Sequence, residues 1–407
     1  MAKEKKKVPN LRFKGFTDDW EQRKLGEIST SFSGGTPSVK NKSYYGGKIP
    51  FIRSAEIHKD KTELFITESG LKNSSAKLIK KGTLLYALYG ATSGEVDVSN
   101  IDGAINQAII AIFLQKDNVG FIKYYLEKNK DKILAKYLQG GQGNLSASII
   151  KSVHINLPFT EEQLKISNLI KKVESLISLQ QRKLDLLKQL KKGLLQKMFA
   201  DKDSERPVLR FKGFHDDWEQ RRLGEVTSHR GGTAIEKYFD ENGEYKVISI
   251  GSYGLDSKYV DQNIRAKSNE VTNERVVHAG ELTMVLNDKT ANGTIIGRSL
   301  LIENDNEYVI NQRTEIIKPE ESFNAKFAYT LLNGPFRNKV KRIVQGGTQI
   351  YVNYSSVEKL TVPLPNMKEQ QKIGSFFNQL DSLIALHQRK QNHLKLLKKS
   401  LLQQMFM

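Results

Sequence analysis

Two long stretches of the chain place an apolar side chain at every third or fourth position. The first covers residues 160–200 and the second covers residues 366–407. This spacing predicts one apolar stripe along each of two long helices. Polar pairs interrupt both stripes, Gln180-Gln181 in the first and His387-Gln388 in the second. One module of this size cannot cover so long a stripe, so we expect the two helices to pack together, antiparallel, as a coiled coil.

Short apolar runs punctuated by glycine fill the remaining sequence, and their order recurs. Each half shows two β-like runs, then a helical stretch that ends at a glycine pair, then an extended segment that ends in Leu-Pro. These segments are residues 82–89, 108–113, 118–138 and 155–158 in the first half, and 280–286, 314–317, 324–344 and 362–365 in the second. The pattern predicts a mixed α/β globular part before each long helix.

The chain also repeats itself residue by residue. Residues 11–28 read LRFKGFTDDWEQRKLGEI and residues 209–226 read LRFKGFHDDWEQRRLGEV, with fifteen of the eighteen positions identical. A Glu-Gln pair opens each long helix, at Glu162-Gln163 and at Glu369-Gln370. The chain is therefore predicted to contain two copies of one module.

The repeat predicts both an architecture and a type of target. We expect an α+β protein with a pseudo-two-fold internal repeat, in which the two long helices join two mixed α/β domains. The expected boundaries are a first domain at residues 1–159, a central long helix at 160–200, a second domain at 201–365 and a C-terminal long helix at 366–407. Two equivalent sites suit a target with two similar faces, and duplex DNA is such a target.

The charge balance favours a polyanionic partner. The 407 residues carry a formal net charge of +19, and phosphate neutralisation drives nucleic-acid binding. An alkaline protein without a nucleic-acid ligand is the alternative. Residues 207–365 contain 21 basic and 21 acidic residues, so DNA binding there needs a local cluster such as Arg337, Lys339, Lys341 and Arg342.

Several classes of chemistry leave no trace in the sequence. No P-loop, no dinucleotide-binding G-x-G-x-x-G after a strand and no G-x-S-x-G nucleophile elbow is present. The seven histidines lack metal-ligand spacing, and there is no cysteine, which is typical of a cytoplasmic protein. No apolar run could span a membrane, and the opening residues lack the apolar core of a secretory signal. We therefore predict no catalytic, cofactor-binding or metal-binding residues.

Glycine-rich polar loops with aromatic and basic neighbours are the candidate DNA-binding segments. Glycine lets a backbone approach a phosphate closely, while amide and basic side chains can read base edges. Ordinary turns are the alternative for any single loop. The candidates in the first module are Gly34, Gly35, Thr36, Tyr44, Tyr45, Arg53, Thr92, Ser93, Gly140, Gly141, Gln142 and Asn144. Those in the second are Arg230, Gly231, Gly232, Thr233, Tyr253, Lys289, Thr290, Gly346, Gly347, Thr348, Gln349 and Tyr351.

The two modules agree in some segments and diverge in others. They share the opening segment, the glycine pair, the Leu-Pro exit and the long helix. They differ between residues 29–138 and 227–344. Shared parts are expected to be framework, and divergent parts to read two different base sequences, which predicts a two-part asymmetric DNA site.

These motifs together resemble the specificity subunit of type I restriction–modification systems. The motifs are Trp20-Glu-Gln-Arg-Lys-Leu-Gly-Glu27 with its copy at 218–225, Ser33-Gly-Gly-Thr-Pro-Ser38, Leu85-Tyr-Ala-Leu-Tyr-Gly-Ala-Thr-Ser-Gly94, Ile105-Asn-Gln107, and the Leu-Pro exits that lead into Glu-Gln. The resemblance covers nearly the whole chain. The second module departs from it at residues 287–293, which replace the Tyr-Gly-Ala-Thr-Ser-Gly loop.

The resemblance implies two target-recognition domains, each reading half of a split site in double-stranded DNA, with the helices setting the spacer. It also implies two modification (methyltransferase) subunits that bring S-adenosylmethionine, and restriction (motor/nuclease) subunits that bring ATP and Mg. The chain itself would be non-catalytic and cofactor-free. Candidate partner contacts on the helices are Leu176, Leu187, Leu194, Phe199, Leu383, Leu394, Leu401 and Phe406.

Two other functions stay open on the residues alone. One is a standalone DNA nuclease with an unrecognised centre, for which the acidic-x-Lys triplet Glu244-Tyr245-Lys246 is an example. Magnesium-dependent cutting by the purified chain would support it. The other is a non-catalytic coiled-coil scaffold, which a flat salt dependence of any DNA binding would favour.

Overall fold

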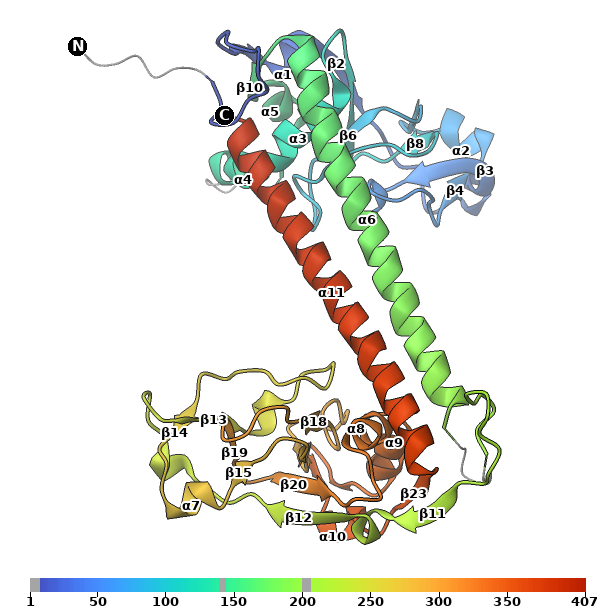
Figure 1. Ribbon diagram of the computed structural model, residues 1–407. Helices are drawn as coiled ribbons and strands as arrows, with labels where there is room; N and C mark the ends of the chain where they lie inside the picture. Colours follow the sequence, from blue (N-terminus) through green and yellow to red (C-terminus); the bar gives the residue numbers. More distant parts are fainter. Residues whose placement is uncertain (1–7, 139–143, 200–205) are drawn as a thin grey trace, which may run out of the picture. The chain divides into compact units, whose positions relative to one another are not determined.

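The computed structural model describes residues 8–138, 144–199 and 206–407, and by contacts it forms two compact units (Figure 1). Unit 1 comprises Met1–Gln181 and Arg389–Met407, and unit 2 comprises Arg182–Gln388. Each unit contains one globular part and a portion of both long helices. The contacts therefore group the chain differently from the four consecutive segments expected from the sequence, and those boundaries stay a prediction.

The two long helices are α6 (Thr160–Lys197) and α11 (Met367–Met405). In unit 1, Glu174 of α6 pairs with Lys398 of α11 at 2.7 Å. Seven residues further along α6, Gln181 bonds to Gln391, which lies seven residues back along α11. In unit 2, Lys191 pairs with Asp381. The residue number of the contact rises along α6 while it falls along α11, so the two helices pair antiparallel, as the apolar stripes predict.

The described residues of unit 1 form two four-stranded sheets and one two-stranded sheet. The first four-stranded sheet has the order β2 (Ser29–Ser33), β9 (Ile109–Leu114), β6 (Leu84–Ala87), β7 (Val96–Val98). The second has the order β4 (Phe65–Ile66), β3 (Tyr45–Ile52), β8 (Gly103–Ile105), β5 (Lys77–Ile79). The two-stranded sheet pairs β1 (Glu21–Lys24) with β10 (His154–Leu157).

Unit 2 repeats this topology with different residues. Its sheets have the orders β12 (Thr227–Gly231), β20 (Thr314–Pro319), β16 (Leu282–Val285), β18 (Ser299–Leu301) and β14 (Arg265–Ala266), β13 (Tyr245–Ile248), β19 (Tyr308–Ile310), β15 (Val276–Val277). The pair β11 (Glu219–Arg222) and β23 (Thr361–Leu364) matches β1 and β10. Unit 2 also has a three-stranded sheet of β17 (Asn287–Asp288), β22 (Ile350–Tyr351) and β21 (Gln345–Gly346).

Short helices complete the two units. In unit 1 they are α1 (Leu25–Ile28), α2 (Glu68–Lys72), α3 (Val119–Lys128), α4 (Lys130–Leu138), α5 (Ala147–Lys151), η1 (Lys42–Tyr44) and η2 (Ser54–Glu56). In unit 2 they are α7 (Glu270–Asn273), α8 (Ala325–Asn333), α9 (Pro335–Arg342), α10 (Tyr354–Val357), η3 (Leu223–Glu225), η4 (Glu236–Tyr238) and η5 (Ile250–Ser252). The fold class, a repeated α+β module with paired long helices, is confirmed.

Two details of the sequence prediction are wrong. Each helix expected before a glycine pair is in fact two helices, because α3 gives way to α4 at Asn129 and α8 gives way to α9 at Gly334. Pro335 begins α9 at a position where its missing N–H costs no hydrogen bond. Gly346 does not end a helix. It lies in β21 with φ +99°, a conformation that glycine adopts without strain.

The repeated opening segment holds each long helix to its module. Arg12 donates two hydrogen bonds, of 2.8 and 2.7 Å, to the buried carboxylate of Glu162 at the start of α6. Gln163 donates to the Pro158 carbonyl at 3.0 Å and accepts from the Asn118 N–H at 2.8 Å. Unit 2 repeats the arrangement with Arg210, Glu369, Gln370, Pro365 and Asn324. The duplicated motifs are therefore framework, as their similarity predicts.

No helix within the described ranges is both long and apolar enough to cross a membrane.

Candidate nucleic-acid interface

The first glycine of each module packs against backbone. A β-carbon on Gly34 would lie 1.9 Å from the Ile105 carbonyl oxygen, and one on Gly232 would lie 2.0 Å from that of Asn311. A β-carbon on Gly35 would lie 2.5 Å from Ser75. These glycines are required by close contact inside the module, so the structure gives them a packing role in place of the expected phosphate contact.

The other candidate residues near Gly34 and Gly35 make contacts within the module. Thr36 bonds to Gln107, and the Tyr45 hydroxyl donates to the Pro37 carbonyl at 2.6 Å. Tyr44, in η1, is half-buried and forms part of the wall around Gly70. Arg53 donates to Glu56 and Glu63, which cancels its charge locally. Burial alone would raise the pKa of Glu56, but hydrogen bonds led by Arg53 outweigh it and lower the pKa to about 2. Arg53 is therefore a poor candidate for a phosphate contact.

The loop after β6 in unit 1 carries Thr92 and Ser93, both half-buried. The Ser93 hydroxyl donates to the Leu88 carbonyl at 3.2 Å. The Leu145 N–H donates to the same carbonyl at 3.0 Å, which brings exposed Asn144 to this loop. Gly140, Gly141 and Gln142 lie outside the described residues. The structure thus gathers Thr92, Ser93 and Asn144 at one end of unit 1.

An ion-pair network borders that loop. His58 contacts Asp97 at 2.8 Å and Glu95 at 2.9 Å, while Lys130 pairs with Glu95 and Lys123 pairs with Asp97. The hydrogen bond to Asp97 raises the pKa of His58 above its ordinary 6.5, with burial opposing it. The bond from Lys130 lowers the pKa of Glu95. For Asp97, burial favours a higher pKa, but His58 and Lys123 outweigh it and lower it.

This network predicts a pH dependence of unit 1 stability. Because the folded pKa of His58 is raised, its contribution is fully present below pH 6.5 and is lost as pH rises through the folded pKa. The lowered pKa values of Glu95 and Asp97 make their contributions disappear only as pH falls through those values. Denaturant unfolding of unit 1, followed across this range, should show stability falling above pH 6.5. In the variant His58→Gln, the stability of unit 1 should not fall above pH 6.5. An equal fall in that variant would show that another group is responsible.

In unit 2 the structure brings two of the candidate loops together. β17 pairs with β22, and β22 pairs with β21, so Asn287 lies opposite Tyr351 and Asp288 opposite Ile350. The buried Asp288 carboxylate holds the first loop by accepting from the N–H groups of Thr290 and Ile295 at 3.0 and 2.8 Å. The residues that share this end of unit 2 are Lys289, Thr290, Gly346, Gly347, Thr348, Gln349 and Tyr351, all exposed.

The remaining candidates of unit 2 lie elsewhere. Arg230 donates to both carboxylate oxygens of Glu281 at 3.0 Å. Gly231 is the last residue of β12, and Thr233 forms an isolated parallel bridge with Asn311. Tyr253 is 3% exposed and its hydroxyl donates to Thr283 at 2.9 Å, so it is a core residue and its expected DNA contact is corrected.

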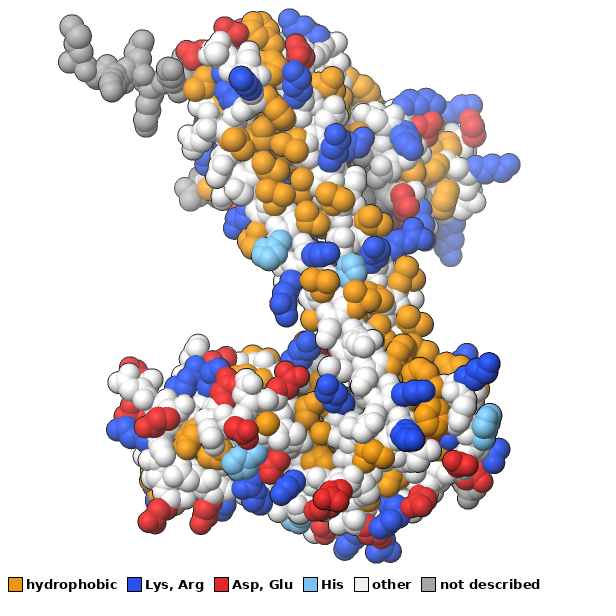
Figure 2. All heavy atoms as spheres, viewed as in Figure 1, with side chains coloured by type: hydrophobic (Ala, Val, Ile, Leu, Met, Phe, Trp, Pro, Cys, Tyr) orange, Lys and Arg blue, Asp and Glu red, His pale blue; other side chains and the backbone are white. Residues whose placement is uncertain are grey.

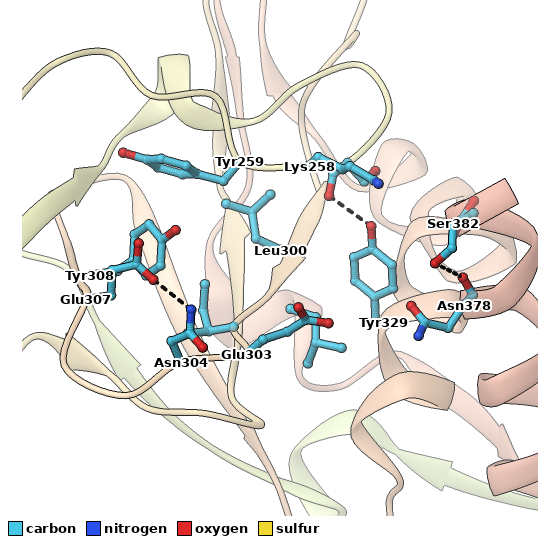
Figure 3. Close-up of a pocket in the computed structure, with 14 residues that line it drawn as sticks. Lys258, Tyr259, Leu300, Glu303, Asn304, Glu307, Tyr308, Tyr329, Asn378 and Ser382 are labelled. Atoms are coloured by element: carbon cyan, nitrogen blue, oxygen red, sulfur yellow. Dashed lines mark hydrogen bonds between the residues drawn. The ribbon is translucent and has the colours of Figure 1, made fainter. Parts of the chain in front are cut away.

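Unit 2 also contains an acidic cavity of about 340 Å³ (Figure 3). Its wall includes the carboxylates of Glu303, Glu307 and Asp381, against one lysine, Lys258. Tyr329 also lines it, with its hydroxyl donating to the Ser257 carbonyl at 2.9 Å. Asp381 pairs with Lys191 and Glu307 pairs with Lys246, so two of these carboxylates already have a cation beside them.

The partner candidates on the long helices fall into two groups. Leu176 and Leu383 are 46% and 39% exposed, and Leu187, Leu194 and Leu394 are half-buried. Leu401, Phe199 and Phe406 are buried in the cores of their units, so they are corrected to packing residues. Further exposed leucines on the helices were not among the partner contacts predicted from the sequence. Figure 2 shows hydrophobic side chains over the helices. The further exposed leucines are Leu164, Leu179, Leu396 and Leu397 in unit 1 and Leu186, Leu190 and Leu386 in unit 2.

Comparison with known proteins identifies the family. The profile of the type I restriction modification DNA specificity domain matches residues 17–189 and again residues 215–396. The chain belongs to this family. Both copies of the repeat match separately, and this confirms the internal duplication and the resemblance found in the sequence.

Relatives and solved structures of this family match over nearly the whole chain. The MjaVIII specificity subunit of Methanocaldococcus jannaschii is 23% identical over 404 residues, covering 95% of this chain and 91% of that protein. The MjaIX specificity subunit of the same organism is 25% identical, covering 94% and 92%. The crystal structure of the S subunit from M. genitalium has a TM-score of 0.67 at 15% identity, covering 98% and 99%. The similarity to that structure concerns the fold alone.

Proposed function

We propose that this DNA-recognition subunit binds a bipartite, asymmetric site in double-stranded DNA, one half through each unit. The observation that carries the proposal is that both units have the same sheet orders but different side chains at the ends of the strands. A shared fold provides two equivalent reading positions, and different side chains there read different bases.

The charges of equivalent segments support unequal half-sites. Residues 34–81 of unit 1 contain ten basic and four acidic residues, whereas residues 232–279 of unit 2 contain six basic and eight acidic residues. Each segment supplies three of the four strands of the small sheet, β3, β4 and β5 in unit 1 and β13, β14 and β15 in unit 2. The fourth strand, β8 or β19, comes from later in the chain and pairs parallel with β3 or β13. Two surfaces of such different charge are not expected to contact DNA in the same way.

The chain is further proposed to direct other subunits to the site it reads, without catalysing a reaction itself. Two modification (methyltransferase) subunits would bring S-adenosylmethionine for adenine-N6 methylation, and restriction (motor/nuclease) subunits would bring ATP and Mg. The exposed leucines of α6 and α11 support docking on the helices, because an apolar stripe in water is stabilised by a partner's apolar surface. Each unit offers its own group of leucines, which suits one modification subunit per unit.

Methylation mapping tests the proposal. In cells that express this chain with its modification subunit, methylated adenines should fall in one two-part motif, and omission of the chain should abolish them. A hybrid with residues 29–138 taken from another family member should change one half of the motif and leave the other half and the spacer unchanged. An unchanged motif in the hybrid would refute the assignment of reading to that segment. Methylation without a two-part motif would refute the bipartite site.

A further inference from the structure

Arg298 and Arg337 of unit 2 both donate to the Thr294 carbonyl, and neither forms an ion pair with a carboxylate of the residues that the structure describes. Arg337 donates to the carbonyl oxygens of Ile296, Gly293 and Thr294 at 2.9, 2.9 and 2.7 Å. Arg298 donates to the Thr294 carbonyl at 2.9 Å and to the Ser257 hydroxyl at 3.0 Å. Neutral oxygens orient both guanidinium groups, and therefore their positive charge is not cancelled by these contacts.

Two lysines add to the same surface. Lys341 lies one turn after Arg337 on α9, and a β-carbon on Gly293 would lie 3.6 Å from its Cε atom. Lys289 is exposed in the loop between β17 and Gly293. Neither lysine forms an ion pair with a carboxylate of the described ranges. We call Lys289, Arg298, Arg337 and Lys341 the unit 2 basic cluster.

The carboxylate whose charge acts on Arg337 and Lys341 is Asp288, which is committed to its own loop, and Asp256 acts on Arg298. Asp288 accepts hydrogen bonds from the N–H groups of Thr290, Ile295 and Ile296 and from the Thr290 and Thr294 hydroxyls. The cations meanwhile repel one another. Burial lowers the pKa of Arg337 to about 10, with Arg298 adding to the effect, and burial followed by Arg337 and Arg298 lowers the pKa of Lys341. An arriving anion would relieve this repulsion.

Unit 1 has the opposite charge at the equivalent place. Gly94 and Gly297 both have positive φ, and their N–H groups donate to equivalent strand ends, Ala87 of β6 and Val285 of β16. The next residue is Glu95 in unit 1 and Arg298 in unit 2. Glu95 neutralises Lys130 of α4, whereas Arg298 stands with Arg337 of α9. The chain has therefore replaced an ion pair by two cations at this one position of unit 2.

The cluster also lies next to side chains suited to reading bases. Its loop is joined by β17 and β22 to the hairpin that carries exposed Thr348, Gln349 and Tyr351. Phosphate contacts position a protein on duplex DNA, and hydrogen bonds to base edges specify the sequence. Unit 2 brings both kinds of group together, although residues 207–365 have no net charge.

We propose that the unit 2 basic cluster binds backbone phosphates of duplex DNA and positions the hairpin 345–351 on the second half-site. The equivalent place in unit 1 makes no such contact because Glu95 occupies it. This inference rests on the proposed function, and it adds where and by which charges unit 2 holds the duplex.

The test is the salt dependence of DNA binding by the full chain. The probe is a fluorescein-labelled duplex of mixed sequence, titrated at several KCl concentrations. Each phosphate contact contributes about 0.9 to the slope of log affinity against log salt. The variant Lys289→Gln/Lys341→Gln should therefore lower the slope by about 1.8, and Lys289→Gln alone by about 0.9. The matched control is Lys237→Gln/Lys258→Gln, which removes the same charge from exposed lysines of unit 2 outside the cluster and should leave the slope unchanged.

A second measurement needs no substitution. Duplex DNA should protect Lys289 and Lys341 from acetylation by an amine-reactive reagent, and should leave Lys258 reactive. If the wild-type chain binds with a steep salt dependence but the double variant keeps its slope, the cluster has no phosphate contact and the proposed function stands. A wild-type chain whose DNA binding is insensitive to salt would overturn both proposals.

Discussion

Replacing Arg210 with alanine is expected to lower the free energy of unfolding of unit 2 by about 3–5 kcal/mol, because it leaves a buried carboxylate without its cation. Glu369 is fully buried at the start of α11, and Arg210 donates two hydrogen bonds of 2.8 Å to it. The Trp218 indole N–H also donates to Glu369, at 3.2 Å. The lost interaction therefore loosens the opening segment and the helix together.

The measurement uses one of the chain's two tryptophans as a reporter for each unit. Trp20 lies in unit 1 and Trp218 in unit 2, so urea unfolding followed by fluorescence in a Trp20→Phe background reports on unit 2. The matched control is Arg221→Ala, which removes an exposed arginine from the pair with Glu225 and should change stability little. Equal losses in the two variants would contradict a special role of the buried pair.

Periodicity and repetition predicted the framework of the fold because both are local or internal properties of the sequence. The three–four spacing of apolar residues was enough to predict both long helices, and the copy at 209–226 was enough to predict a second module. The repeat could not show what its residues do. Arg12 and Glu162 are 150 positions apart, and only the folded chain shows that they pair.

The positions where the helices of each module end were predicted less well than the long helices. The Gly334-Pro335 pair is a signal for the end of one helix and the start of another, yet the apolar pattern of 324–344 suggested a single helix. The break at Asn129 in unit 1 has no proline to mark it. The shared topology of the divergent segments was equally hidden, because many of their strands are only two to four residues long and too short to show a period.

Candidate site residues were harder to predict than the fold because a residue type does not reveal its neighbours. Gly34 and Gly232 were expected to approach phosphate, but a carbonyl oxygen lies against each of them. In the sequence Lys341 belongs to a basic run, and no motif marks Arg298. Their importance depends on the loop and helix that bring them together, and on the contrast with Glu95 in unit 1.

Replacing Phe199 with alanine is expected to lower the free energy of unfolding of unit 2 by about 3–5 kcal/mol, because removing a large buried aromatic side chain leaves a cavity in the core. Phe199 is 3% exposed, and its ring centroid lies 5.6 Å from that of Phe327 and 6.2 Å from that of Trp218. It therefore fixes the end of α6 to the domain that follows it. The loss is measured by the same Trp218 fluorescence in the Trp20→Phe background.

The matched variant is Leu190→Asp on the exposed face of the same helix. Leu190 is 51% exposed, so its replacement should leave unit 2 about as stable as before while weakening co-purification with the modification subunit. The two variants separate core packing from partner docking on one helix. If Phe199→Ala kept its stability and lost the partner, the sequence-based expectation that Phe199 contacts another subunit would be right and its assignment to the core wrong.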